Sequence, residues 1–327
     1  MALINPPLLV AGGTHEARAF RMMLRDMARG AEGVTEGDDL RVRALSAPGP
    51  AVLVGDGSAV ILGRAGRNQG AYTAYNLGDA TVQIAPTGAT PRTDLLVLRI
   101  TDPEYEGVLN PVTDAIANWY VISNLNTRWP GIRRPPGVGA RLIGNLPQPG
   151  MTYIPLAEIH VPANTVNITS SMITDLRNVA NPRQSRQVEV ASPGGDVDAP
   201  WLNPGTWYDW PPCTAWRVWV PEWAVYCRAQ VSIHGLQING GWFWGAFGFA
   251  LGSVAGQSTN LDTSALVAGN RSEAAAADSL YIPPEMRGTW QQFTGRITRW
   301  SDGGGGIPQT DTATTAVLDL DFIEDIW

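Results

Sequence analysis

The stretch PRTDLLVLRITDP occupies residues 91–103. Its centre, Leu95 to Leu98 followed by Ile100, is a continuous apolar run of strand length. Such a run is typical of a strand covered on both faces, because no polar face is left for water. Pro91 and Pro103 cannot donate ladder hydrogen bonds, so they mark its ends. We therefore expect this strand at the centre of an N-terminal domain.

A helix is predicted upstream, over residues 14–30. Thr14 is a plausible N-cap after two glycines, and Gly30 ends the helix. The apolar stripe at helical spacing is Ala17, Phe20, Leu24 and Met27.

A second stripe of this helix is made of Arg18, Arg21, Arg25 and Arg29. Such a stripe is most often a solvated face. The alternative is a docking surface for an acidic neighbour, which makes these four arginines the candidates for assembly contacts.

Short strands fill most of the remaining N-terminal half. Gly55–Ser58 and Asn76–Asp79 each separate two apolar runs and predict hairpins. Residues 119–125 and 153–161 read as further strands, and residues 172–177 as a helical turn. The segment 127–150 is rich in Pro and Gly and predicts a semi-rigid extended connection. The fold class predicted here is an antiparallel β domain with one short helix, spanning residues 1–185.

Residues 186–327 have a different composition, with eleven of the 13 tryptophans. About six segments of strand character alternate with Gly, Pro, Asn and Ser, which favours a jelly-roll-like β-sandwich. The stretch 183–200 is polar and reads as a linker containing one strand, near 187–190.

Composition excludes several classes of protein. The net charge of −7 argues against a nucleic-acid binder, because phosphate contacts need a positive surface. The start MALINPPLLVAGG has no basic n-region, and no run approaches a membrane span, so neither a signal peptide nor a membrane segment is predicted. Cys213 and Cys227 allow one disulfide, but two reduced, buried thiols are the favoured interpretation.

The N-terminal half resembles the attachment domain of minor tail or baseplate proteins of long-tailed bacteriophages. The likeness covers most of residues 11–180 and lies in the order of several segments: GGTHEARAFRMML, GDGSAVILGR, GAYTAYN, PRTDLLVLRITDPEYEG, IPLAEIHVPANT and ITDLR. It implies a domain docked in several copies onto a tail tip, and it carries over no catalytic motif.

Catalytic signals are thin. His15, His160 and His234 lie in separate elements without ligand spacing, and no nucleophile elbow or phosphate loop is present, so no metal or cofactor is predicted. A glycan hydrolase needs two facing carboxylates. The acids of the C-terminal half that offer this alternative are Asp209, Glu222, Asp262, Glu273, Asp278 and Glu285.

The tryptophans are the stronger functional signal. Trp242 and Trp244 share one face of the run 242–250, and the phenylalanines share the other. The second face is covered within the domain, or it meets another subunit, another domain or a ligand. Trp201, Trp207 and Trp210 lie in a Pro- and Gly-rich entry, where they stack on sugars, anchor an interface or cap the sandwich.

These observations predict a non-enzymatic structural protein of a phage tail tip or baseplate. Its expected place is the virion, after synthesis in the host cytoplasm. The expected partners are the tail hub, the distal tail protein or neighbouring minor tail proteins, further copies of itself in a homotrimer, and a glycan of the host surface. The alternative function is a virion-associated glycan hydrolase of the cell wall.

Overall fold

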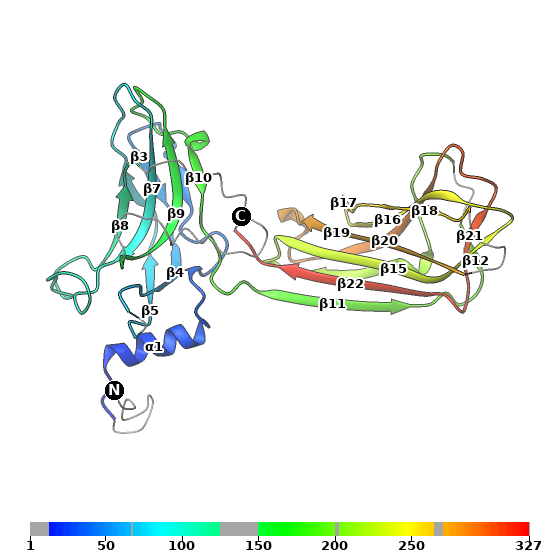
Figure 1. Cartoon of the computed structure of the whole chain (residues 1–327), viewed down its shortest axis with the longest axis horizontal. Coiled ribbons are helices and arrows are strands. Elements are labelled where there is room, and N and C mark those ends of the chain that lie inside the picture. The colour runs from blue at the N-terminus through cyan, green and yellow to red at the C-terminus, as the bar shows by residue number, and fades with distance from the viewer. Residues whose placement is uncertain (1–12, 67, 125–149, 200–202, 265–270, 327) are drawn as a thin grey trace. The chain divides into compact units, whose positions relative to one another are not determined.

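A computed structural model describes residues 13–66, 68–124, 150–199, 203–264 and 271–326 (Figure 1). The chain forms two compact units. Unit 1 is Met1–Asn181 with Ile326–Trp327, and unit 2 is Pro182–Asp325. The boundary near residue 185 stays a prediction, and the extended segment predicted at 127–150 lies outside the described residues except for Gly150. Both units are built mainly of antiparallel strands, which confirms the predicted fold class.

The described residues of unit 1 form one α-helix and three small sheets (Figure 1). The helix is α1 (Ala17–Met27). The first sheet has the strand order β1 (Gly33–Val34), β4 (Gly57–Leu62), β5 (Ala71–Asn76). The second has the order β2 (Val42–Ala44), β3 (Ala51–Val54), β6 (Ala80–Gln83). The third has the order β10 (Ile173–Asp175), β9 (Thr152–Val161), β7 (Arg92–Ile100), β8 (Ala117–Ile122).

Strand β7 lies between β8 and β9 and is buried on both faces, as its apolar run predicts. Leu96, Leu98 and Ile100 belong to the main core of unit 1. Leu95 and Val97 point the other way, into a smaller cluster. Alternation along the strand therefore connects two separate cores.

Helix α1 is shorter than predicted and is oriented differently. It begins at Ala17 after Glu16, which makes no side-chain cap bond, so Thr14 is not its N-cap. The predicted apolar stripe is largely exposed, with Phe20 at 45% and Met27 at 70%, while Ala19 is buried. The helix face that carries Arg21 is turned toward the rest of unit 1, because Arg21 contacts Gln69, Asp102 and Glu104 there. Among the described residues no helix is long and apolar enough to cross a membrane.

Neither predicted hairpin forms. The strands before and after Gly55–Ser58 are β3 and β4, and they belong to different sheets. The same holds for β5 and β6, which flank Asn76–Asp79. The chain crosses between sheets at both places, and Gly57 makes this feasible: its φ is +134°, and a Cβ atom there would lie 2.6 Å from the Cα atom of Asp39.

Other local predictions differ by a few residues. The strand predicted at 119–125 is β8 and begins two residues earlier, and the helical turn predicted at 172–177 is a 3-10 turn, Ser170–Met172, followed by β10. The predicted linker strand is longer than expected, because it pairs along eight residues with the last strand of the chain.

Unit 2 is a β-sandwich of two six-stranded sheets enclosing one core. One sheet contains β11 (Gln184–Ala191), β22 (Thr315–Ile323), β15 (Tyr226–Asn239), β21 (Ile307–Thr310), β12 (Val197–Asp198) and β19 (Ser272–Tyr281). The other contains β13 (Tyr208–Asp209), β20 (Thr289–Arg299), β16 (Trp244–Leu251), β17 (Val254–Ala255), β14 (Trp216–Val220) and β18 (Thr259–Asp262). Short 3-10 turns lie at Pro212–Thr214 and Pro284–Met286.

Candidate functional site

An exposed aromatic cluster lies on the outer face of the β14–β20 pair. Trp219 is directly opposite Trp290, and 41% and 54% of these residues are exposed. Their ring centroids are 5.5 Å apart at an interplanar angle of 66°, an edge-to-face contact. The Cζ atom of Arg217 lies 5.0 Å from the Trp290 ring centroid, within cation–π range. We call Arg217, Trp219 and Trp290 the indole surface.

The alternation of β14 creates this surface. Val218 and Val220 are 2% and 0% exposed and belong to the sandwich core. Arg217 and Trp219 alternate with them and therefore point outward. The pattern WRVWV at 216–220 contains this signal, yet the aromatic candidates selected from the sequence omit both Trp219 and Trp290.

The exposed area of the two indoles has an energetic consequence. A covered indole buries about 150–250 Å², so the two together expose roughly 200 Å² at these fractions. Covering that area would contribute roughly 5 kcal/mol at about 25 cal/mol per Å², before the entropic costs of association. Scattered apolar residues on a surface need no explanation. Trp219 and Trp290 are instead register-paired neighbours, and we take them as a candidate contact site.

The entry tryptophans pack within unit 2 where they are described. Trp210 is 2% exposed and belongs to the core. Trp207 is half-buried beside β16, since a Cβ atom on Gly248 would lie 3.5 Å from its Cη2 atom. Trp201 lies outside the described residues. Of the alternatives left open by the sequence, these positions favour capping of the sandwich.

The second face of β16 is covered inside unit 2. Ala246 is 0% exposed and Gly248 is buried, so this part of the strand needs no other subunit. Trp244 is half-buried, and Trp242 remains 43% exposed. The Trp242 indole packs on the glycine-rich loop after β20, where a Cβ atom on Gly304 would lie 2.7 Å from its Cδ2 atom.

Two arginines of the α1 stripe have acidic partners outside the helix. Arg18 and Arg21 both bind the carboxylate of Glu104, in the loop after β7. Arg21 also lies 3.4 Å from a carboxylate oxygen of Asp102 and donates from Nε to the Gln69 carbonyl at 2.9 Å. Hydrogen bonds from the two arginines lower the pKa of Glu104 to about 2.

The other two arginines of the stripe lie at the end of the helix. Arg25 pairs with its neighbour Asp26 at 3.1 Å. Arg29 is exposed and has a left-handed φ of 54° just after the helix. The docking role of the four arginines stays a prediction.

A polar groove of about 770 Å³ lies on the outer face of the β15–β22 sheet. Asp278, Asp319 and Asp321 line it together with Arg186 and Arg228. Arg186 donates to Asp319 at 2.8 Å and lowers the pKa of that carboxyl. A general acid needs the opposite shift, so this pairing does not favour the hydrolase alternative.

The other carboxylates considered for hydrolysis are dispersed. Asp209 pairs with Arg296 at 3.3 Å, and Asp262 accepts a bond from the main-chain N–H of Ser264 at 2.9 Å. Among the six acids suggested by the sequence, only Asp278 lines the groove. In the described part of the chain, no cluster of three His, Cys, Asp or Glu residues is arranged to hold a metal.

A chain of hydrogen bonds joins Ser232, His234 and Glu273 on the same outer face. The His234 ring nitrogens lie 2.9 Å from Ser232 Oγ and 3.0 Å from Glu273 Oε1. This order of groups resembles a hydrolytic triad. However, β15 pairs with a strand on each side at Ser232. The main-chain N–H groups of β15 at Ser232 are therefore used by the sheet and are not free to form an oxyanion hole.

Comparisons with known proteins leave the family open. No family model matches the chain, and no curated protein matches it. The chain is similar to a structure of the infectious bursal disease virus Gx strain, with 13% identity, coverage of 90% of this chain and 76% of that one, and a TM-score of 0.30. It is also similar to a VP2 subviral particle of the same virus, with 11% identity, coverage of 93% of this chain and 81% of that one, and a TM-score of 0.27.

A β-sandwich carbohydrate-binding module is a more distant match. It has 10% identity, covers 89% of this chain and 100% of that one, and gives a TM-score of 0.15. At these TM-scores the likenesses carry no argument about the function of this chain.

Proposed function

We propose that the chain is a structural component of a virion, at the tail tip of a bacteriophage, whose unit 2 binds a host-surface glycan through the indole surface. The observation that supports the binding role most strongly is the register-paired Trp219 and Trp290 with Arg217 beside them. Aromatic faces stack on the apolar faces of sugar rings, and a guanidinium donates to hydroxyl or carboxylate oxygens.

The size of the surface favours a glycan over a subunit interface. A stable protein interface buries about 800 Å² on each partner, whereas the two indoles expose roughly 200 Å². The nearby outward residue Gln292, opposite Arg217, is exposed and polar. A small aromatic area with polar neighbours suits one or two sugar rings better than a protein face.

The virion role rests on the ordered sequence segments of unit 1 that resemble phage attachment domains. The exposed apolar stripe of α1, with Phe20 and Met27, supports it, since such a stripe gains free energy when another chain covers it. We infer that unit 1 attaches and that unit 2 is presented outward.

Two measurements test this function. Gold-labelled antibody against the chain should mark the tail tip of purified virions of the virus that encodes it. The purified full chain should bind specific glycans on an array that includes neutral and acidic sugars. Labelling elsewhere or absent from virions would contradict the structural role, and an array without any binding would contradict the glycan role.

A further inference from the structure

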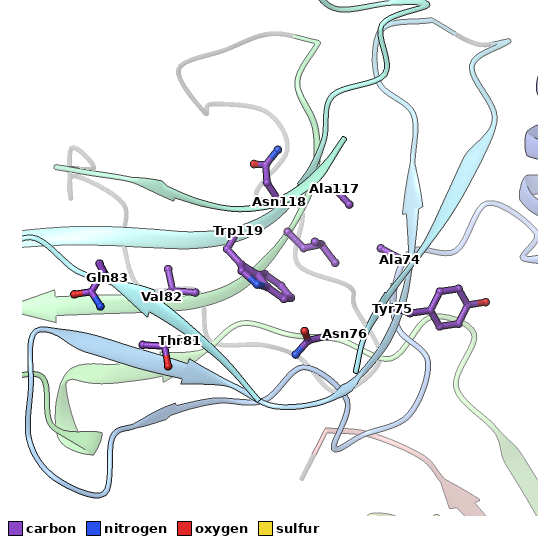
Figure 2. A pocket seen from close by; sticks show the side chains of 10 residues that line it. Ala74, Tyr75, Asn76, Thr81, Val82, Gln83, Ala117, Asn118 and Trp119 are labelled. Carbon is purple, nitrogen blue, oxygen red and sulfur yellow. The ribbon is translucent and has the colours of Figure 1, made fainter. Parts of the chain in front are cut away.

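A cavity of about 510 Å³ in unit 1 opens where three sheets end (Figure 2). Strands β5, β6 and β8 border it, and each is the last strand of its sheet. Within the described part of the chain, each of the three pairs with another strand on one side only. Unpaired strand edges therefore surround this cavity.

Runs of consecutive residues line the cavity, such as Thr81 to Gln83 and Ala117 to Trp119. Neighbouring side chains of a strand point to opposite faces, so a cavity lined by such runs touches the edges of the strands. Figure 2 shows the Trp119 indole and the Asn76 side chain turned toward each other, with Tyr75 turned away. Tyr75 is 72% exposed, in agreement with that direction.

The directions of the main-chain groups follow from two hydrogen bonds. The N–H of Ile84 donates to the Pro50 carbonyl at 2.9 Å. Main-chain groups alternate in an antiparallel ladder, so those of Val82 also face β3, and those of Thr81 and Gln83 face the open side.

The main-chain groups of β8 alternate in the same way. The N–H of Thr101 donates to the Ile116 carbonyl at 2.8 Å. The main-chain groups of Ala117 and Trp119 therefore point away from β7. Both pairs of outward residues, on β6 and on β8, line the cavity.

The remaining lining is apolar or already engaged. Val82 and Leu98 are 8% and 4% exposed and form an apolar floor. The amide nitrogen of Asn76 donates to the carbonyls of Gly55 and Gly78, at 2.8 and 2.7 Å. No charged side chain is among the described residues that line the cavity. The groups it offers to a ligand are mainly main-chain N–H and C=O groups above an apolar floor.

We propose that this cavity binds an extended, uncharged peptide segment of a partner protein, which adds as a strand to the open edge of β6. The peptide main chain supplies the complementary donors and acceptors, and a small apolar side chain lies over Val82 and Leu98. The four residues of β6 offer an edge roughly 13 Å long at about 3.3 Å per residue. The inference rests on unit 1 alone and does not depend on the proposed glycan role.

A saccharide fits less well. Sugar hydroxyls are bound by polar side chains that converge on the ligand. The polar side chains of Thr81, Gln83 and Asn118 alternate with the inward-facing residues and point away from the cavity.

The test uses the full chain, isotopically labelled for NMR, and a panel of acetylated, amidated seven-residue peptides in which threonine alternates with alanine, valine, leucine or serine. We expect at least one peptide to shift the amide signals of Thr81, Gln83 and Trp119 and to slow the hydrogen exchange of Thr81 and Gln83. Binding is then measured for a matched pair, Thr81→Pro and Thr81→Ala. Proline removes the outward N–H without removing a bond to β3, so we expect Thr81→Pro to bind about tenfold more weakly than Thr81→Ala.

Three results would overturn the proposal. The first is a panel in which no peptide shifts these signals. The second is equal binding by the two variants. The third is a response of Trp119 and Asn76 to methyl glucoside or methyl galactoside but to no peptide. If Thr81→Pro does not fold, as judged by its circular dichroism, hydrogen exchange in the unmodified chain decides instead. Exchange at Thr81 and Gln83 that no peptide slows would then overturn the proposal.

Discussion

Glu104 is the residue through which helix α1 is held to the loop after β7. Its folded pKa of about 2 lies below the ordinary value of about 4.3, so its ion pairs stabilise the fold fully above that value and are lost as the pH falls toward 2. We predict that Glu104→Gln destabilises the chain at neutral pH by a modest amount, because the group is partly exposed and screened.

Urea unfolding of the two proteins between pH 7 and pH 2 measures this effect. The gap in unfolding free energy should be widest at neutral pH and close between about pH 4.5 and pH 2. The same substitution at the exposed Glu189 is the control and should leave a gap near zero throughout. A gap for Glu104→Gln that does not change with pH would contradict the assigned pairing.

The two cysteines should differ in reactivity. Neither forms a disulfide; Cys227 is buried and Cys213 is half-buried. Burial raises the pKa of the Cys227 thiol to about 12 and raises that of Cys213 as well. Because the thiolate is the reactive form, we predict that iodoacetamide modifies Cys213 first in the native chain and both in urea. Mass spectrometry of digested samples reads this order, and prior modification of Cys227 would contradict the packing of β15.

Strand β7 is the element on which the cores of unit 1 depend. Leu96 is 0% exposed, so we predict that Leu96→Ala costs about 2–5 kcal/mol of unfolding free energy, through lost burial and a cavity. Val188, 51% exposed on β11, is the control, and its replacement by alanine should change stability by less than about 0.5 kcal/mol. Urea titration measures both, and equal costs would contradict the two-sided burial of β7.

Elements whose pattern is local could be predicted from the sequence. The run Leu95–Leu98 has no polar alternation, and this identified β7 and its two covered faces. The hairpins were predicted wrongly, because turn residues at Gly55–Ser58 show where a strand ends but not which strand it pairs with. The inward face of α1 also escaped prediction: Arg21 is held by Glu104, 83 residues away in sequence, a pairing that helical periodicity cannot reveal.

The positions of the exposed tryptophans could not be predicted from the sequence. Tryptophans are enriched in the C-terminal half, but this enrichment does not show which indoles are exposed: Trp210 is core, whereas Trp219 and Trp290 are exposed. The exposure of Trp290 depends on its register with Trp219 across two strands that are distant in sequence. Such a register follows from the packing of the sandwich and not from any local pattern.

At the scale of the whole molecule, we predict that the purified chain self-associates, most simply as a homotrimer. The exposed α1 stripe is a candidate contact, because covering Phe20 and Met27 removes apolar area from water. Light scattering coupled to size exclusion should give about three times the chain mass of 35.1 kDa. Phe20→Ser with Met27→Ser should shift this toward one chain mass, and a monomer at high concentration would contradict self-driven assembly.

The indole surface is the centre of the functional account. The decisive measurement is calorimetric titration of the best glycan from the array into the full chain, into the Trp219→Ala, Trp290→Ala double variant, and into Trp242→Ala. The account predicts that the double variant loses at least about thirtyfold in affinity, the effect of removing a contact worth about 2 kcal/mol, while Trp242→Ala, at similar exposure, binds as the unmodified chain does. Unchanged binding by the folded double variant, or loss in Trp242→Ala instead, would contradict it.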